Sequence, residues 1–431
     1  MKKWTKSSLI VAVSAMMVFA LAACGGNNNE GNNGGTQGDS SEQKTVSIFQ
    51  FKTEIVEPLN ELAAEFEKEY PNINIEVQTV GGGADYGAAL KTKFASNQAP
   101  DIFSNGGYAE MDMWFEHLED LSDQPWVENL LPLAKEPMTK DGKVYGWPIG
   151  LEGFGFVYNK DLFEQAGITE EPKTISELVA AAEKLEAAGI TPFANGYKEW
   201  WLLGLQGVNV AFGAQEDPTA FIQGLSDGTE KIPGNQKFEE WVDLIDLTLK
   251  YGNKNPLTTD YNTQLSLFTS GQAAMMQQGN WSQVQLDEIS PGMNIGFLPM
   301  AANDNAEESD KLHVGVPSNW VINKNSPVKE EAKTFINWLV TSEIGQRYIV
   351  EEFQSIPSLS SIEVAEGAMG PLSSEVWEYA QAGKIFQLQN SKFPDGVGQE
   401  FASEIQAYIG GQTSREELLQ QMQDSWDKLA K

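Results

Sequence analysis

Strand and helix patterns alternate along residues 45–105, and this alternation constrains the fold of the chain more than any other feature. Residues 45–51 alternate in side-chain character with a period of two and are rich in β-forming types, which predicts a strand. Residues 55–70 then carry apolar side chains at helical spacing, and Pro71 ends this predicted helix. A strand followed by a helix begins a β-α-β unit, so the next strands decide the kind of sheet.

Two more strands complete the pattern. Residues 73–77 alternate again, residues 86–96 form the next predicted helix, and residues 100–103 are predicted as a short buried strand. The order β-α-β-α-β predicts an α/β fold with a parallel sheet and right-handed crossovers. Ligands of such sheets lie beyond the carboxyl ends of the strands, which here means the loops at 52–54 and 105–108.

Charge and composition exclude several classes of function. The chain has 61 Asp and Glu against 29 Lys and Arg, and its net charge of −32 repels nucleic-acid phosphates. One cysteine and two histidines exclude a disulfide framework and argue against a metal site, so we expect no metal and no cofactor. The sequence also lacks nucleophile-elbow, phosphate-loop, zinc-helix and complete dinucleotide-binding motifs. Although its many carboxylates allow a hypothetical glycosidase pair, we expect no enzyme.

The N-terminal residues 1–23 are predicted to be a signal peptide. Three lysines precede an apolar stretch over 9–22, which has secretory length and is too short for a stable membrane span. The stretch ends in LAACG at 21–25, which resembles a bacterial lipobox; a plain signal peptide with a chance cysteine is the alternative. The lipobox implies cleavage before Cys24 and a diacylglyceryl group on its sulfur. We therefore expect a lipoprotein, held to the extracellular face of the cell membrane by lipid and not by a helix.

Residues 24–43 follow this predicted signal peptide and contain glycine, asparagine and serine but no large apolar side chain. Such a composition cannot bury enough surface to offset the entropy of ordering, so we predict a flexible tether. The folded body then covers residues 44–431, a length that suits two domains.

Several sequence blocks of this body carry a family resemblance. They are DGKVYGWPIGLEGFGFVYNKDLF (141–163), PKTISEL (172–178), AGITPFA (188–194), FTSGQAAMM (268–276), GNWS (279–282), VGVPSNWVI (314–322) and TSEIGQ (341–346). The blocks resemble the sugar-binding branch of the extracellular solute-binding proteins that feed ABC importers. They occur in that family's order, and the resemblance covers nearly the whole body.

The resemblance implies a two-lobed, periplasmic-binding-protein-like α/β fold with parallel or mixed sheets and a ligand cleft between the lobes. Three hinge crossings would join the lobes and absorb the backbone rotation on closure. Carried onto this chain, lobe one is 44–150 plus 313–354, lobe two is 153–300 plus 358–431, and the crossings are 148–153, 299–313 and 354–357.

A sugar presents an apolar face and a rim of hydroxyls, which aromatic rings and planar polar side chains complement. The residues and the resemblance together give eight candidate ligand-binding residues. They are Lys52, Glu54, Asn105, Glu152, Trp200, Trp201, Trp281 and Asp395. Structural alternatives stand beside them. Lys52 and Glu54 could form a solvated pair, Glu152 a hinge hydrogen bond, and Asp395 an ordinary Pro-Asp-Gly turn.

The 12 tryptophans cannot all bind ligand. Of the pair at 200–201, at least one ring is expected in the cleft, with capping of the lobe core as the alternative. For Trp320, packing beneath the cleft and ligand contact remain equally open. The tryptophans that fall in helical stripes or near helix ends and the first crossing are predicted to pack, namely Trp114, Trp126, Trp147, Trp241, Trp338, Trp377 and Trp426.

Together with these features, the resemblance implies a monomeric receptor that closes on a neutral oligosaccharide. The resemblance alone implies that the receptor presents the sugar to the permease subunits of an ABC importer. Acidic ligands call for arginine clamps, and neither Arg347 nor Arg415 lies in a suitable loop. A polyamine or a peptide is the alternative ligand, since an acidic cleft suits a polyamine. A structural lipoprotein would explain the anchor but not the two-lobe pattern.

Overall fold

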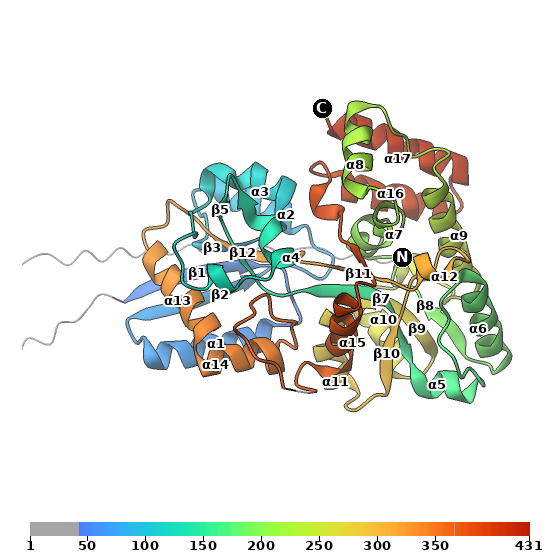
Figure 1. The fold of residues 1–431 in the computed structure, drawn as a ribbon, viewed down its shortest axis with the longest axis horizontal. Helices are drawn as coiled ribbons and strands as arrows, with labels where there is room; N and C mark the ends of the chain where they lie inside the picture. The colour runs from blue at the N-terminus through green and yellow to red at the C-terminus, as the bar shows by residue number, and fades with distance from the viewer. Residues whose placement is uncertain (1–42, 366) are drawn as a thin grey trace, which may run out of the picture. The chain divides into compact units, whose positions relative to one another are not determined.

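Two β-sheets organise the computed structural model, which describes residues 43–365 and 367–431 (Figure 1). The predicted signal peptide, the lipidation site Cys24 and nearly all of the predicted tether lie outside the described residues. Among the described residues, no helix has the length and apolar character needed to cross a membrane. The same residues hold no group of His, Cys, Asp and Glu side chains that could bind a metal ion.

The first sheet has five strands. In order across the sheet they are β2 (Ile73–Thr79), β1 (Lys44–Gln50), β3 (Ile102–Asn105), β12 (Asn319–Ile322) and β6 (Trp147–Pro148). The predicted parallel arrangement is confirmed, because β1 runs parallel to both β2 and β3, with Val46 opposite Ile75 and Ile48 opposite Ile102. β12 pairs antiparallel with β3 and β6, so the sheet as a whole is mixed.

Helices pack on both faces of this sheet. They are α1 (Val56–Glu69), α2 (Tyr86–Ala95), α3 (Tyr108–Trp114), α4 (Pro132–Lys135), α13 (Lys329–Thr341) and α14 (Glu343–Arg347). Successive residues of β1 point to opposite faces. Ile48 therefore packs in one core with Phe66 of α1 and Phe335 of α13, whereas Phe49 packs in another with Leu90 of α2. We call this sheet with its helices the first lobe.

The second sheet has six strands built around β7. They are β13 (Ile385–Gln387), β11 (Leu312–Gly315), β7 (Glu152–Asn159), β9 (Ala273–Gly279), β8 (Thr191–Ala194) and β10 (Ile295–Leu298), which pairs with β7. β7 is antiparallel to β9, β10 and β11, while β8 is parallel to β9. A separate two-stranded ribbon joins β4 (Thr139–Lys140) to β5 (Lys143–Val144).

The helices of this second lobe pack on the sheet and on one another. They are α5 (Lys160–Gln165), α6 (Ile175–Ala187), α7 (Asn209–Gly213), α8 (Pro218–Asp227), α9 (Gln236–Lys250), α10 (Tyr261–Thr269), α11 (Gln283–Ile289), α12 (Ala306–Ser309), α15 (Gly370–Gln381), α16 (Val397–Ile409) and α17 (Arg415–Leu429). α6 begins with a capping box in which Thr174 and Glu177 satisfy each other's backbone N–H groups. Phe154 and Phe156 of β7 point into the core beneath these helices.

The chain first passes between the sheets at 149–151, from β6 to β7. The predicted second crossing at 299–313 is wrong. β11 pairs with β7 and β13, so the chain stays in the second lobe until Gly315 and passes to the first sheet at 316–318. After residue 352, Ile356 still pairs with Leu151 of the first passage, and Leu359 pairs with Leu130 of the first lobe. The third passage therefore ends later than the predicted 354–357.

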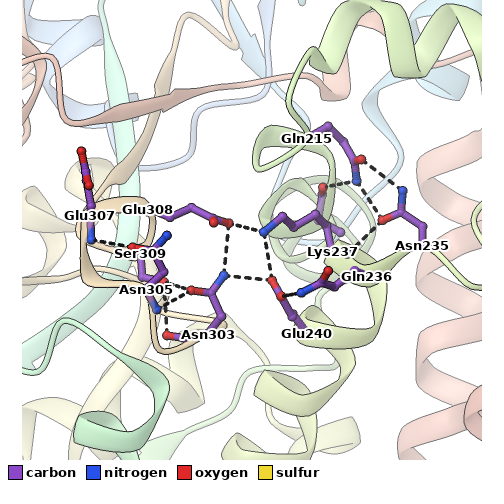
Figure 2. A network of polar contacts seen from close by, with 11 residues as sticks. Gln215, Asn235, Gln236, Lys237, Glu240, Asn303, Asn305, Glu307, Glu308 and Ser309 are labelled. Carbon is purple, nitrogen blue, oxygen red and sulfur yellow. Dashed lines mark hydrogen bonds and ion pairs between the residues drawn. The ribbon is translucent and has the colours of Figure 1, made fainter.

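A polar network holds the segment after β10 to the second lobe (Figure 2). Nδ2 of Asn303 donates to Glu240 of α9 at 2.9 Å and to Glu308 of α12 at 3.1 Å. Nζ of Lys237 contacts the same two carboxylates. These contacts hold this segment to the second lobe, although the family resemblance placed the second crossing there.

Most of the predicted packing tryptophans are confirmed. The exception is Trp377, which is only partly buried at the edge of a core. Trp320, which could either pack or contact ligand, is 1% exposed, and its ring lies 5.4 Å from that of Trp147. The open question for Trp320 is therefore decided in favour of packing. The buried members of the set are Trp114, Trp126, Trp147, Trp241, Trp338 and Trp426.

Candidate functional site

Strand ends from both sheets carry the predicted site residues. In the first lobe, Lys52 and Glu54 follow β1, and Asn105 ends β3. In the second lobe, Glu152 begins β7 and Trp281 follows β9. Because β7 and β9 are antiparallel, the start of one and the end of the other lie at the same edge of the second sheet.

Lys52 connects the two lobes through its ammonium group. Its Nζ lies 2.6 Å from Oε1 of Glu54 in the same loop and 2.5 Å from Oε1 of Glu152 at the start of β7. The three side chains are 9%, 11% and 15% exposed, respectively. The alternative of a solvated Lys52–Glu54 pair is therefore wrong, since both side chains are nearly buried and share a contact network with the other lobe.

The electrostatics of this group fix the charge on Lys52. Burial alone would lower the pKa of Lys52, but the charges of Glu152 and Glu54 hold it above its ordinary value. Burial raises the pKa of Glu152, and the charge of Lys52 opposes that rise. At neutral pH Lys52 is a charged donor of hydrogen bonds, set between two acceptors that come from different lobes.

The loop that carries Lys52 is held by its neighbours. Gln50 is wholly buried; its Oε1 accepts from N of Lys52 at 2.5 Å, and its Nε2 donates to O of Lys52 at 2.9 Å and to Oγ1 of Thr79 at 2.6 Å. A Cβ at Gly81 would come within 2.1 Å of the carbonyl oxygen of Phe51, so only glycine fits there. The backbone of Lys52 is thus positioned before any ligand is considered.

Three aromatic rings gather on the second-lobe side. The ring of Trp201 lies 6.3 Å from that of Trp281 and 6.1 Å from that of Tyr261, edge to face in both cases. Nε1 of Trp201 donates to Glu199 at 3.2 Å, and Nε1 of Trp281 donates to Gln278 at 3.0 Å. Both indoles are partly exposed, so the hydrogen bonds fix the planes of rings that are not fully enclosed by packing.

The end of β9 sets the position of Trp281. The indole lies over Gly279, where a Cβ would come within 2.0 Å of the ring. Oδ1 of Asn280 accepts from N of Gly153 at 2.9 Å, and its Nδ2 donates to Ser373 at 2.8 Å. The same short segment therefore supports both Trp281 and the residue that follows Glu152.

Asn105 lies at the end of β3 and is 1% exposed. Its Oδ1 accepts from N of Gly107 at 2.8 Å, and its backbone oxygen accepts from Nδ2 of Asn319 at 3.0 Å. Within the described residues, Nδ2 of Asn105 is buried without a partner. An unpartnered amide at a strand end is the kind of donor that a ligand hydroxyl can satisfy.

Trp200 and Asp395 have different surroundings from the other candidates. Trp200 packs against the second-lobe core and is partly buried. The carboxylate of Asp395 is 59% exposed and lies 2.6 Å from Nζ of Lys91, a first-lobe residue of α2. The structure thus brings together Lys52, Glu54 and Glu152, and separately Trp201 and Trp281.

Two residues of this site were missed by sequence analysis. Glu199 lies in the polar break before the tryptophan pair, and Tyr261 begins α10. Burial and the charges of Glu54 and Glu199 raise the pKa of Tyr261 well above its ordinary value. Tyr261 therefore interacts electrostatically with carboxylates of both lobes. An acidic residue directly before two tryptophans was the signal available in the sequence. We call Lys52, Glu54, Glu152, Glu199, Trp201, Tyr261 and Trp281 the interlobe face.

Two α/β lobes joined by several chain passages, with polar and aromatic side chains from both lobes where they meet, define a two-lobed binding protein. The chain belongs to the bacterial extracellular solute-binding protein family, whose model matches residues 52–346. That match includes the interlobe face from Lys52 to Trp281 but ends before Asp395.

Relatives and solved structures agree with this assignment. The melibiose/raffinose/stachyose-binding protein MelE of Bacillus subtilis (strain 168) is 24% identical over 396 residues, 85% of this chain and 87% of that protein. A chitin oligosaccharide binding protein of known structure has a TM-score of 0.77 at 26% identity, covering 90% of this chain and 98% of that one. RafE in complex with raffinose has a TM-score of 0.76 at 21% identity, covering 90% and 100%, and this likeness concerns the fold alone.

Proposed function

We propose that the protein is an extracellular receptor that binds a neutral oligosaccharide between its lobes and delivers it to the permease subunits of an ABC importer. The observation that carries the proposal is the Lys52–Glu54–Glu152 group, which draws charged hydrogen-bonding atoms from both lobes to one place. The names of two relatives, which cite melibiose, raffinose and stachyose or chitin oligosaccharide, support a sugar ligand.

In this proposal, hydrogen bonds to sugar hydroxyls replace some of the contacts that residues of the interlobe face make with one another. Lys52 donates to hydroxyl oxygens, while Glu54 and Glu152 accept from hydroxyl hydrogens. Trp201 and Trp281 offer faces to the apolar side of a sugar ring. The proposed ligand-binding set is Lys52, Glu54, Asn105, Glu152, Trp200, Trp201, Trp281 and Asp395.

Delivery requires that ligand favours one arrangement of the lobes. A ligand can shift a conformational equilibrium only through a difference in its affinity for the two states. A sugar that contacts Lys52 from one lobe and Glu152 from the other gains both sets of contacts only when the lobes approach. The protein would act as a monomer without catalytic turnover, held by lipid on Cys24 to the outer face of the membrane.

A polyamine is the second candidate ligand, because the two buried carboxylates Glu54 and Glu152 face a single ammonium. A thermal-shift screen with raffinose, stachyose, chito-oligosaccharides and spermidine separates the two candidates. Stabilisation by at least one of the sugars, followed by titration calorimetry and by compaction in solution scattering, is the expected result. Stabilisation by spermidine alone would replace the sugar proposal, and turnover of a bound sugar would show an enzyme.

A further inference from the structure

We infer that Glu199 and Tyr261 form an acceptor–donor pair that selects ligands with free neighbouring hydroxyls, and that Glu199 also positions the ring of Trp201. The inference rests on the proposed function and extends it to specificity. It depends on the contacts of the Glu199 carboxylate, on the unpartnered hydroxyl of Tyr261, whose backbone N–H donates to that carboxylate, and on the first-lobe loop that faces it.

Glu199 is 3% exposed, and its carboxylate lacks a cationic partner among the ion pairs of the described residues. Its Oε2 accepts from Nε1 of Trp201 at 3.2 Å, and its Oε1 accepts from N of Tyr261 at 3.0 Å. A carboxylate offers about four acceptor positions, so capacity for hydrogen bonds remains. By contrast, the structural acid Asp101 receives three short bonds, two from Ser47 and one from Ser326.

The hydroxyl of Tyr261 supplies an independent observation. It is buried, and within the described part of the chain it has no hydrogen-bond partner. Burial, and after it the charges of Glu54 and Glu199, raise the pKa of Tyr261 well above its ordinary value, so the hydroxyl keeps its proton at neutral pH. A buried hydroxyl without an acceptor costs free energy, and a ligand oxygen that accepts from it removes that cost.

A loop of the first lobe approaches the carboxylate. A Cβ at Gly83, in the loop after β2, would come within 2.7 Å of Oε2 of Glu199, and Gly83 has a φ of +88°. The left-handed glycine lets the backbone of this loop approach the carboxylate, where the Cβ of any other residue would clash with it. Glu199 therefore lies where the lobes meet, although it belongs to the second lobe.

The chemistry of the pair determines which ligand it accepts. One hydroxyl of a sugar ring would donate to Glu199, and its neighbour would accept from Tyr261 while the ring lies against Trp201. A ligand whose hydroxyl is methylated or missing leaves the buried carboxylate without its donor. Sites built to hydrogen-bond a hydroxyl reject such analogues strongly.

The test uses the full mature chain with raffinose, stachyose and chito-oligosaccharides as probes. Titration calorimetry compares wild type with Glu199→Gln, Tyr261→Phe and the matched control Glu404→Gln, a partly buried second-lobe acid bonded to Ser425. We expect about tenfold weaker binding for Glu199→Gln and about three- to tenfold for Tyr261→Phe, against less than about twofold for the control. An O-methylated form of the bound sugar should bind wild type more weakly than the unmodified sugar does. The two forms should bind Glu199→Gln with similar affinity.

Thermal stability separates a ligand role from a structural one. Tyr261→Phe removes an unpartnered buried hydroxyl, so its melting temperature should be unchanged or higher while its affinity falls. Sugar binding that is unaffected in both Glu199→Gln and Tyr261→Phe would overturn this inference and leave the proposed function intact. Failure of wild type to bind any of the sugars would remove both.

Discussion

In the second-lobe core, the ring of Phe212 lies 5.1 Å from that of Phe238, 4.5 Å from that of Phe393 and 5.7 Å from that of Trp426. At the interlobe face, Trp201 has two ring neighbours at more than 6 Å, and its Nε1 donates to Glu199. Nε1 of Trp426, by contrast, is buried without a partner within the described residues.

The two regions hold aromatic rings in place by different forces. In the core, contacts on all sides hold the ring, and the cavity beside Trp241 has a volume of about 10 Å³, room for no more than about one water molecule. At the interlobe face, a directed hydrogen bond holds the indole while part of its surface stays free. Truncating a ring should therefore change stability in the first region and affinity in the second.

Trp241→Ala should give the largest effect of all. Trp241 is 2% exposed in α9, and removing a large buried ring costs about 3–5 kcal/mol of unfolding free energy through lost burial and the cavity left behind. Sugar affinity of the folded fraction should stay near that of wild type. Denaturant unfolding and calorimetry at a temperature where the variant is folded measure both quantities, and a loss of affinity without a loss of stability would reverse the comparison.

His313 should make the core sensitive to acid. Burial lowers the pKa of His313 to about 3, while its ordinary value is 6.5. The folded state therefore binds fewer protons than the unfolded state, so the contribution of His313 is complete above pH 6.5 and is lost as the pH falls toward 3. At pH 4.5 this loss is about 2–3 kcal/mol.

The variant His313→Gln isolates the contribution of His313 to the unfolding free energy, because the carboxylates titrate alike in wild type and variant. The gap in unfolding free energy between wild type and variant should narrow by about 2–3 kcal/mol from pH 7.5 to pH 4.5. A gap that stays constant over this range would show that His313 is protonated in the folded protein.

Trp281→Ala tests the interlobe side of the comparison. Loss of stacking and apolar contact should weaken sugar binding about tenfold or more, where tenfold is about 1.4 kcal/mol, with a smaller change in stability than for Trp241→Ala. Titration calorimetry on a variant with a normal circular dichroism spectrum gives the answer. Measuring the stability and the affinity of Trp241→Ala and Trp281→Ala with the same sugar compares the core and the interlobe face directly.

Glu152→Gln keeps the shape of the side chain and removes its charge. We expect about three- to tenfold weaker sugar binding, because hydrogen bonds to a charged acceptor are stronger than those to an amide. Calorimetry again measures the affinity. If both Glu152→Gln and Trp281→Ala bind sugar as wild type does, the ligand lies elsewhere in the molecule.

Asp395→Asn should give the smallest effect, about two- to threefold in affinity and less than about 1 kcal/mol in stability. Its carboxylate and Lys91 are 59% and 48% exposed, and exposed ion pairs contribute little because water and salt screen them. Lys91→Met serves as the control, since it removes the ion pair and leaves Asp395 available to ligand. A tenfold effect of Asp395→Asn with none of Lys91→Met would make Asp395 a main ligand contact.

Periodicity and motifs in the sequence were enough to predict the local elements and the class of fold. The period-two pattern of 45–51 and the helical spacing of 55–70 became β1 and α1 with small shifts at their ends, because these periodicities follow from backbone geometry. The same reasoning assigned Trp241 and Trp426 to packed helix faces. The motif blocks pointed to the family that matches residues 52–346.

Contacts between residues far apart in the chain could not be predicted from these patterns, because they depend on tertiary packing. β11 pairs with β7 and β13 across long sequence separations, so the second passage lies at 316–318 and not at 299–313. The contact of Lys52 with Glu152 and the role of Glu199 likewise depend on how two lobes approach. Periodicity reports the face on which a side chain lies, but the partner across that face is set by packing between segments far apart in the chain.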